Sequence, residues 1–303
     1  VGQAAVWKIW EFRPQNLSNT VWAFAKLVAN HDELLEAVGQ VSVRKIWEFN
    51  PQKLSNTVWA FATLESRDEE LLEAVGQAAV WKISEFNPQA LSNTVWAFAT
   101  LELREQELLE AVGQAAVWKI WEFSSQNLPN TVWAFAKLVA NHDELLEAVG
   151  QAAVWKIREF NPQALSNTVW ALAKVGLRDQ ELLEAVGQAA VWKIREFNPQ
   201  DLSNTVWALA KVGLRDQELL EAEGQGTVWK IREFAPQALS NTVWAFATLE
   251  SRDKELLEAV GQAAVWKIWE FSPLALSNAV WAFAKVESRD QELLDAEGQV
   301  APQ

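Results

Sequence analysis

A fixed internal repeat of 37 residues constrains the fold of this chain more than any other feature of its sequence. A tryptophan recurs at this period inside the phrase Leu-Ser-Asn-Thr-Val-Trp-Ala-Phe-Ala. A repeat of this length cannot bury its apolar face alone, so the period predicts a solenoid in which each repeat packs on its neighbours. Glycine marks the same register without an insertion or deletion, at Gly2, Gly39, Gly76, Gly113, Gly150, Gly187, Gly224, Gly261 and Gly298.

Each repeat predicts two helices separated by a turn. In the segment 68–101, Asp68 can cap a first helix whose early acids suit the helix dipole. Apolar residues at spacings of three and four extend this helix to about five turns, through Leu72, Val75, Ala79, Ile83 and Phe86. Asn87 then caps a second helix, with Pro88 at its first position. The apolar stripe of the second helix is Leu91, Val95 and Phe98.

Glycines have two predicted roles in these helices. Gly176 and Gly213 follow the second helix at a C-cap position. Gly76 and its counterparts lie within the first helix, where glycine costs about 1 kcal/mol relative to alanine. Close contact with a neighbouring helix is the favoured reason, and a kink that splits the helix in two is the alternative.

We therefore expect an all-α fold, a right-handed α-solenoid of eight 37-residue helix-turn-helix repeats. The sequence contains no methionine, so we expect the chain to be a segment of a longer protein. A single array is predicted over residues 1–303, with repeats that begin near Gly2, Gly39, Gly76, Gly113, Gly150, Gly187, Gly224 and Gly261.

Composition excludes several functions. The formal net charge of −14 disfavours general adhesion to nucleic acid or to an anionic membrane. No apolar run reaches the about 18 residues of a membrane span, so no membrane insertion is expected. Cysteine is absent, and His31 and His142 occupy equivalent loop positions where a capping role is favoured. The carboxylates recur too regularly to mark one acid-base pair. We expect no enzyme, no metal site and no cofactor.

Lysines recur near the end of the first helix, at positions such as Lys8, Lys45 and Lys82. They predict a mixed or basic rim. A glutamate such as Glu85 follows each of them after three residues, so a phosphate track there would be interrupted and strongly salt-dependent.

Two columns on the first helix form the main candidate site. Helical geometry places Trp81 opposite the apolar stripe. Tryptophan and arginine both stack on planar rings, so the columns predict a ladder for unpaired RNA bases on the concave surface. Burial between neighbouring repeats is the alternative, because aromatic stripes are usually core. The first column is Trp7, Arg44, Trp81, Trp118, Trp155, Trp192, Trp229 and Trp266, and the second is Trp10, Trp47, Ser84, Trp121, Arg158, Arg195, Arg232 and Trp269.

The second helix offers weaker candidates. Asn56 belongs to a column of eight asparagines, for which a ladder of amides that holds neighbouring helices or backbone is favoured. The tryptophans of the repeated phrase are predicted to be structural: Trp22, Trp59, Trp96, Trp133, Trp170, Trp207, Trp244 and Trp281. Two variable columns could read bases, one with Asn16, Lys53, Asn127 and Asp201, and one with Lys26, Lys137, Lys174, Lys211 and Lys285.

The segment from Phe49 to Ala62 and the segment from Leu172 to Gly176 resemble the octotricopeptide repeats, and the 37-residue period is similar to that of the heptatricopeptide repeats. The resemblance covers the whole chain. It implies a paired-helix solenoid of chloroplasts or mitochondria that binds single-stranded RNA in transcript stability, processing, translation or ribosome assembly. The acidic charge and the near-identical repeats favour an alternative, a scaffold that binds protein partners on its concave surface or at its open ends.

Overall fold

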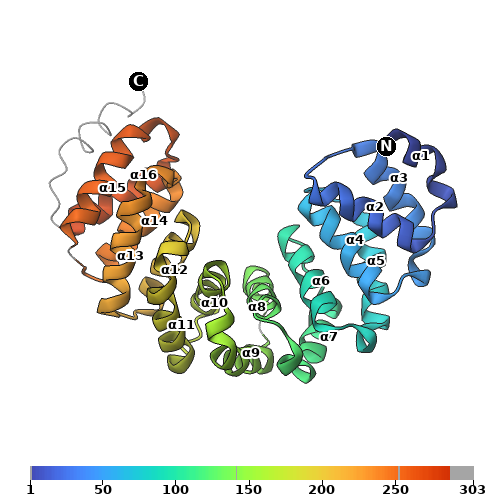
Figure 1. Cartoon of the computed structure of the whole chain (residues 1–303), viewed down its shortest axis with the longest axis horizontal. Helices are drawn as coiled ribbons and strands as arrows, with labels where there is room; N and C mark the ends of the chain where they lie inside the picture. Colours follow the sequence, from blue (N-terminus) through green and yellow to red (C-terminus); the bar gives the residue numbers. More distant parts are fainter. Residues whose placement is uncertain (1, 141, 252, 287–303) are drawn as a thin grey trace. The chain divides into compact units, whose positions relative to one another are not determined.

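The computed structural model describes residues 2–140, 142–251 and 253–286 (Figure 1). Within these residues the structure is helical and contains no strand. Helices follow one another in tandem and pack on their neighbours, so the prediction of an all-α solenoid of helical repeats is confirmed. The chain divides into two compact units, Val1–Ala153 (unit 1) and Val154–Gln303 (unit 2), and the boundary falls within one helix.

In unit 1 a short 3-10 turn follows each of the odd-numbered α-helices α1, α3, α5 and α7. Its α-helices are α1 (Gly2–Lys8), α2 (Pro14–Lys26), α3 (Asp32–Arg44), α4 (Pro51–Thr63), α5 (Glu69–Trp81), α6 (Pro88–Thr100), α7 (Gln106–Trp118), α8 (Asn127–Lys137) and most of α9 (Asp143–Lys156). Its 3-10 turns are η1 (Ile9–Glu11), η2 (Ile46–Glu48), η3 (Ile83–Glu85) and η4 (Ile120–Glu122).

Unit 2 repeats the pattern. Its α-helices after α9 are α10 (Pro162–Val175), α11 (Gln180–Lys193), α12 (Pro199–Val212), α13 (Gln217–Lys230), α14 (Pro236–Thr248), α15 (Lys254–Trp266) and α16 (Pro273–Lys285). Its 3-10 turns are η5 (Ile157–Glu159), η6 (Ile194–Glu196), η7 (Ile231–Glu233) and η8 (Ile268–Glu270).

The helix starts follow the predicted caps. Asn87 Oδ1 accepts a hydrogen bond from the Ala90 N–H at 2.8 Å, and Pro88 occupies the first position of α6. Asp68 Oδ1 accepts from the Leu71 N–H at 3.0 Å at the start of α5. His31 Nδ1 accepts from the Leu34 N–H at 3.3 Å, so the capping role of this histidine is confirmed. Each cap satisfies one of the N–H groups that a helix start leaves without an intrahelical partner.

The first helix of each repeat is shorter than predicted. In the third repeat, α5 ends at Trp81, and Lys82 leaves the helical conformation at φ −100° and ψ 11°. The chain then tightens into η3, where the Glu85 N–H donates to the Lys82 carbonyl at 2.9 Å. Ile83 and Phe86 keep helical spacing in the sequence but lie beyond the α-helix, and Phe86 is buried by the turn.

Several glycines within the first helices lie where another residue approaches closely, and the helices run through them without a kink. At Gly76 a Cβ atom would meet only Phe98, at 3.7 Å. Helix α3 runs unbroken through Gly39, where a Cβ atom would overlap the carboxylate of Asp68 in the next repeat. A Cβ atom at Gly113 would likewise overlap the ring of His142. Glycine therefore lets the capping residue of one repeat approach the preceding helix.

In each unit the even-numbered helices form one layer and the odd-numbered helices form the other (Figure 1). Neighbouring even-numbered helices pack together more extensively than neighbouring odd-numbered ones. Leu54, Val58 and Phe61 of α4 are buried between the layers, as are their equivalents in α6, α8, α10, α12 and α14. The core is thus one continuous apolar seam per unit, built mainly by the even-numbered helices.

A lysine links each repeat to the one before it. Lys82 Nζ donates to the carbonyls of Trp47 at 2.8 Å and Phe49 at 2.6 Å. The same arrangement recurs at Lys45, Lys119, Lys193, Lys230 and Lys267. The mixed or basic rim stays a prediction; at this column the ammonium groups bind the backbone at the end of the preceding 3-10 turn.

Candidate nucleic-acid interface

In each unit, every even-numbered helix carries one stripe of exposed and half-buried residues along the layer that these helices form there. On α4 the stripe contains Gln52, Asn56, Trp59 and Thr63, whose spacing places them on the helix face turned away from Val58 and Phe61. The same positions in α6, α8, α10, α12 and α14 also lie at the surface. We call the set of these stripes the even-helix face. It carries rings, amides and hydroxyl or ammonium groups in parallel columns.

The tryptophans of the repeated phrase are not core residues. Trp22 is 42% exposed and Trp281 is 46% exposed, and the other six are half-buried. Their structural role stays a prediction: Val58 points inward, and Trp59, one residue later, is turned partly toward solvent. The rings of Trp59 and Trp96 lie 6.4 Å apart at an interplanar angle of 30°. The column is thus a surface ladder of indole rings.

Lysines lie between these rings. Lys26 Nζ is 5.5 Å from the ring centroid of Trp22 and 4.9 Å from that of Trp59 in the next repeat. Lys211 bridges Trp207 and Trp244 in the same way, at 5.5 and 5.2 Å. Such cation-π contacts hold an ammonium group at the surface beside a stacking ring. Lys137 and Lys285 approach the rings of Trp133 and Trp281, while Lys174 is exposed.

The asparagine amides lie on the same stripe. Gln200 Nε2 donates to Asn204 Oδ1 at 2.8 Å, and Gln237 Nε2 donates to Asn241 Oδ1 at 2.9 Å. At these two sites the amides are bonded within one helix, whereas a bond to a neighbouring helix or backbone was expected. Paired amides of this kind leave further donors and acceptors for a ligand.

The residues of the first variable column differ in exposure and in hydrogen bonding. Asn16 Oδ1 accepts from the Arg13 N–H at 3.1 Å, and Asn127 Oδ1 accepts from the Ser124 hydroxyl at 2.9 Å. Asp201 is buried and Lys53 is half-buried. Base reading by this column stays a prediction. The column lies at the start of each helix, where side chains bond back to the helix start or face the neighbouring helix.

The tryptophan and arginine columns of the odd-numbered helices are exposed. Their tryptophans range from 52% to 89% exposed, and Arg44, Arg158, Arg195 and Arg232 lie at the surface. Burial between repeats, the favoured alternative, is therefore wrong. The first column lies at the ends of the odd-numbered α-helices, and the second column lies in the 3-10 turns that come next. The two columns therefore form a surface separate from the even-helix face.

Second-column residues of one repeat touch first-column residues of the next. The Arg44 guanidinium lies 4.7 Å from the Trp10 ring centroid, and the rings of Trp47 and Trp81 meet edge to face at 5.9 Å. Arg195 and Arg232 approach Trp229 and Trp266 at 5.1 and 5.7 Å. We call these two columns the Trp/Arg seam.

Charge is divided between the two layers. The described even-numbered helices carry Asp201 as their one acidic residue, and it is buried. The odd-numbered helices carry exposed glutamates. A hollow of about 310 Å³ between α5 and α7 is lined by Glu73, Glu105 and Glu107. The chain is acidic overall, yet the charged residues of the even-helix face are lysines: Lys26, Lys137, Lys174, Lys211 and Lys285. Glu102, in the loop after α6, lies 3.8 Å from the Lys137 ammonium group.

A family model matches most of the chain. The family model described as RESC8, RNA-editing substrate-binding complex 8 protein, matches residues 3–235. The chain belongs to the RESC8 family. The matched residues run from α1 to the end of η7 and thus include helices of both layers. No curated protein matches the chain.

One acidic pair in this RESC8-family chain was missed by sequence reasoning. Burial raises the pKa of Asp201, which accepts from the Ser166 hydroxyl at 3.3 Å. Burial and the nearby charge of Asp201 raise the pKa of Glu223 well above its usual value. The sequence did contain a signal for this pair, because Glu223 stands in a column that mostly holds an apolar residue. That column holds valine at Val38, Val75, Val112, Val149, Val186 and Val260.

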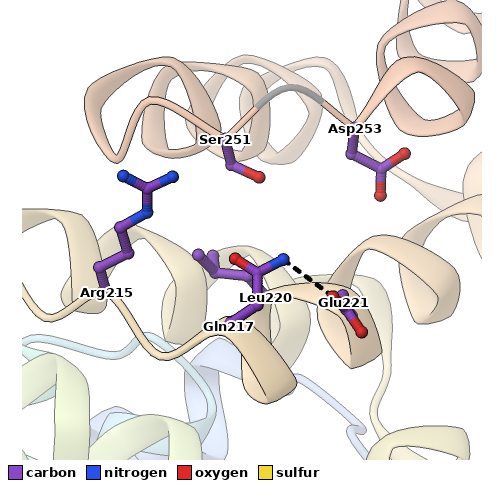
Figure 2. A pocket seen from close by; sticks show the side chains of 6 residues that line it. All are labelled: Arg215, Gln217, Leu220, Glu221, Ser251 and Asp253. Carbon is purple, nitrogen blue, oxygen red and sulfur yellow. Dashed lines mark hydrogen bonds between the residues drawn. The ribbon is translucent and has the colours of Figure 1, made fainter.

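A hollow of about 240 Å³ lies between the starts of α13 and α15 (Figure 2). Gln217 Nε2 donates to Glu221 Oε1 at 2.8 Å on its α13 side. Asp253 Oδ1 caps α15 by accepting from the Leu256 N–H at 3.0 Å. The helices themselves use these polar groups, so the hollow is a groove between two helix starts.

Over residues 2–140, 142–251 and 253–286, three or more histidine, aspartate or glutamate side chains never gather where they could bind a metal ion. Over the same part of the chain, every helix is too short or too polar to cross a bilayer.

Proposed function

We propose that this chain is a modular single-stranded RNA-binding protein whose ligand lies along the even-helix face. The observation that carries the proposal is the composition of this face: it combines a tryptophan ladder with amide and lysine columns, and the one acidic residue of the described even-numbered helices, Asp201, is buried. We propose the mitochondrion or the chloroplast as its location and transcript stability, processing, translation or ribosome assembly as its role.

The columns suit the parts of a single-stranded nucleic acid. Unpaired bases stack on aromatic rings, and each stacked base contributes about 1–3 kcal/mol. Asparagine and glutamine amides can bond to exposed base edges, which are accessible in single strands. Lysines such as Lys174 and Lys211 can neutralise phosphates beside the rings. The recurrence of the same groups in every repeat supports binding along a strand and not catalysis at one point.

Two likenesses support an RNA ligand. The RESC8 family is described by its place in an RNA-editing substrate-binding complex, which supports RNA and protein partners for this chain. The resemblance to octotricopeptide repeats implies single-stranded RNA and an organelle. Both are compatible with a ligand that follows the even-numbered helices.

Two charge-reversal sets test the proposal. The first set changes Lys137, Lys174, Lys211 and Lys285 to Glu on the even-helix face. The second changes Arg44, Arg158, Arg195 and Arg232 to Glu on the Trp/Arg seam, with the same change in net charge. Fluorescence anisotropy of a labelled, randomised single-stranded RNA should show at least a tenfold loss of affinity, or about 1.4 kcal/mol, for the first set and little change for the second.

The other outcomes are equally informative. Loss of RNA binding in the arginine set alone would place RNA on the Trp/Arg seam and reject the even-helix face. Absence of saturable binding by the unmodified chain at low salt, where electrostatic attraction is strongest, would reject RNA binding. A scaffold that binds protein partners is the second candidate, favoured by the acidic net charge of −14.

A further inference from the structure

The Trp/Arg seam of unit 1 exposes far more indole surface than a solitary protein usually presents. Trp7, Trp81 and Trp118 are 79%, 73% and 89% exposed, and Trp10, Trp47 and Trp121 are each more than half exposed. With about 150–250 Å² per tryptophan, these six rings leave on the order of 600–1,000 Å² of apolar surface in water. One side of a stable protein interface buries about 800 Å². Exposed patches of this size mark interaction surfaces.

The seam is linear and periodic. Each repeat contributes one first-column and one second-column residue, and contacts such as Arg44 with Trp10 and Trp47 with Trp81 connect adjacent repeats. Packed helices lie about 8–10 Å apart. A polyproline II helix rises about 3.1 Å per residue with three residues per turn, or about 9 Å per turn. One turn of such a helix would therefore match one repeat of the seam.

Charge around the unit 1 seam favours a basic ligand over a phosphate backbone. Glu11, Glu48, Glu85 and Glu122 directly follow the second column, and all four are exposed. Arg44 is the cationic residue within the seam of this unit, and the neighbouring lysines Lys45, Lys82 and Lys119 bind backbone carbonyls. The seam is thus apolar with an acidic border.

We propose that the unit 1 seam is a docking surface for a proline-rich polypeptide segment of a partner protein, bound as a polyproline II helix with basic residues between its prolines. Proline rings pack on exposed indoles, and a polyproline II helix is already ordered before it binds. Basic side chains pair with the glutamate border. This surface is separate from the even-helix face, so the proposal does not depend on RNA binding.

Position 84 gives the seam its most open point. Repeats 1, 2 and 4 place tryptophan in this column at Trp10, Trp47 and Trp121, whereas repeat 3 has Ser84. Trp47 covers part of Trp81 in the following repeat, but serine has no ring to cover Trp118, which is 89% exposed. The Trp118 ring beside Ser84 is therefore the proposed seat of a proline of the ligand.

The test uses the full chain and fluorescein-labelled peptides. The probe is a peptide of Pro-Pro-Lys triplets, about 12 residues long, which spans about 37 Å and so about four repeats. A Gly-Ser-Lys peptide of the same length and charge controls for simple charge attraction. The variants are Trp81→Ala with Trp118→Ala, and Ser84→Trp. Trp22→Ala with Trp281→Ala removes two exposed tryptophans from the even-helix face as the matched control.

We expect saturable binding of the Pro-Pro-Lys peptide, at least about tenfold tighter than that of the Gly-Ser-Lys peptide. Both seam variants should weaken it at least about tenfold, and the control should not. Ser84→Trp keeps the test valid if the double alanine variant does not fold. Equal binding of both peptides, absence of binding, or insensitivity to both seam variants would overturn the proposal. Loss of single-stranded RNA binding in the seam variants, with the control unaffected, would assign the seam to RNA instead.

Discussion

Burial of the Glu223 carboxyl group destabilises the fold more than the contacts of this side chain visibly stabilise it. The side chain is fully buried, and neither carboxylate oxygen has a hydrogen-bond partner. Its pKa is raised well above the usual value by burial and by the charge of Asp201. The column of Glu223 holds valine at seven other positions, Val1, Val38, Val75, Val112, Val149, Val186 and Val260, so an apolar side chain fits this position of the fold.

We predict that Glu223→Val stabilises the protein at neutral pH by at least about 2 kcal/mol, because it removes a buried polar group without a partner. A raised pKa means that the folded state holds a proton that the unfolded state releases. Stability from this group is therefore complete below about pH 4.3, the usual glutamate pKa, and is lost as the pH rises toward the folded-state pKa.

Urea unfolding at several pH values measures both effects. The Glu223→Val variant should lose the decline in stability above the usual glutamate pKa. Glu221→Val, two residues away and exposed, is the matched control and should change stability by about 0.5 kcal/mol or less. A destabilised Glu223→Val variant would mean that the carboxyl group makes a bond that is essential to unit 2.

Val139 illustrates local backbone strain. It follows α8 with φ 52°, a left-handed conformation that β-branched residues avoid, and it is largely exposed. Gly176 and Gly213 hold the equivalent positions with φ 73° and 70°.

We predict that Val139→Gly raises stability by about 1 kcal/mol, since the left-handed conformation costs residues with a side chain about 1–2 kcal/mol. The reverse change, Gly176→Val, should lower stability by a similar amount. Denaturant midpoints of the two variants give the comparison. Equal midpoints for both variants and the unmodified chain would show that the loop relaxes at no cost.

At the scale of the elements, the junction between repeats depends on the lysine at the end of each odd-numbered helix. Lys82 Nζ donates two hydrogen bonds to carbonyls of η2 and its C-cap, Trp47 and Phe49. Hydrogen bonds from charged groups contribute about 1.5–3 kcal/mol each.

We predict that Lys82→Met, which keeps the length of the side chain, destabilises the protein by about 2–4 kcal/mol. The loss arises because two carbonyls lose a charged donor. Lys254→Met, at the exposed start of α15, should have almost no effect on stability. Thermal unfolding followed by circular dichroism checks both, and equal melting temperatures would argue that water replaces the ammonium group without cost.

The two helices and their caps could be predicted from sequence, because Asp68, Asn87 and Pro88 act through bonds within a few residues. The end of the first helix could not. Ile83 and Phe86 keep helical spacing, and only the contact of Lys82 with the preceding repeat shows why the chain tightens there. Trp59 and Trp81 could not be assigned to core or surface either, because burial depends on which helix faces are covered by neighbours. Composition does not reveal that.

At the scale of the whole molecule, an acidic chain can offer a cationic face because its charges are sorted by layer. The even-numbered helices carry six lysines: Lys26, Lys53, Lys137, Lys174, Lys211 and Lys285. That number limits how many phosphates the even-helix face can neutralise.

We predict a moderate salt dependence of RNA affinity. For single strands the slope of log K against log salt is about −0.7 per phosphate neutralised, so six lysines give a slope no steeper than about −4. Anisotropy titrations across a salt series measure the slope. A steeper value would mean that RNA also contacts cations outside the even-numbered helices, such as the exposed loop residues Arg67 and Arg178.

The lysine junction also bears on how such a chain can change through generations. Lys82, Lys119 and Lys193 bond to the backbone carbonyls of Trp47, Ser84 and Arg158, three residues with unlike side chains in one column. The lysine bonds to main-chain carbonyls, so the junction does not depend on the side chains of the residues that carry them. A repeat can therefore be copied, lost or exchanged by recombination without a compensating mutation in its neighbour. The residues of the surface columns can diverge while the junctions between repeats stay the same. The length of the ligand surface and its residues can therefore be inherited separately.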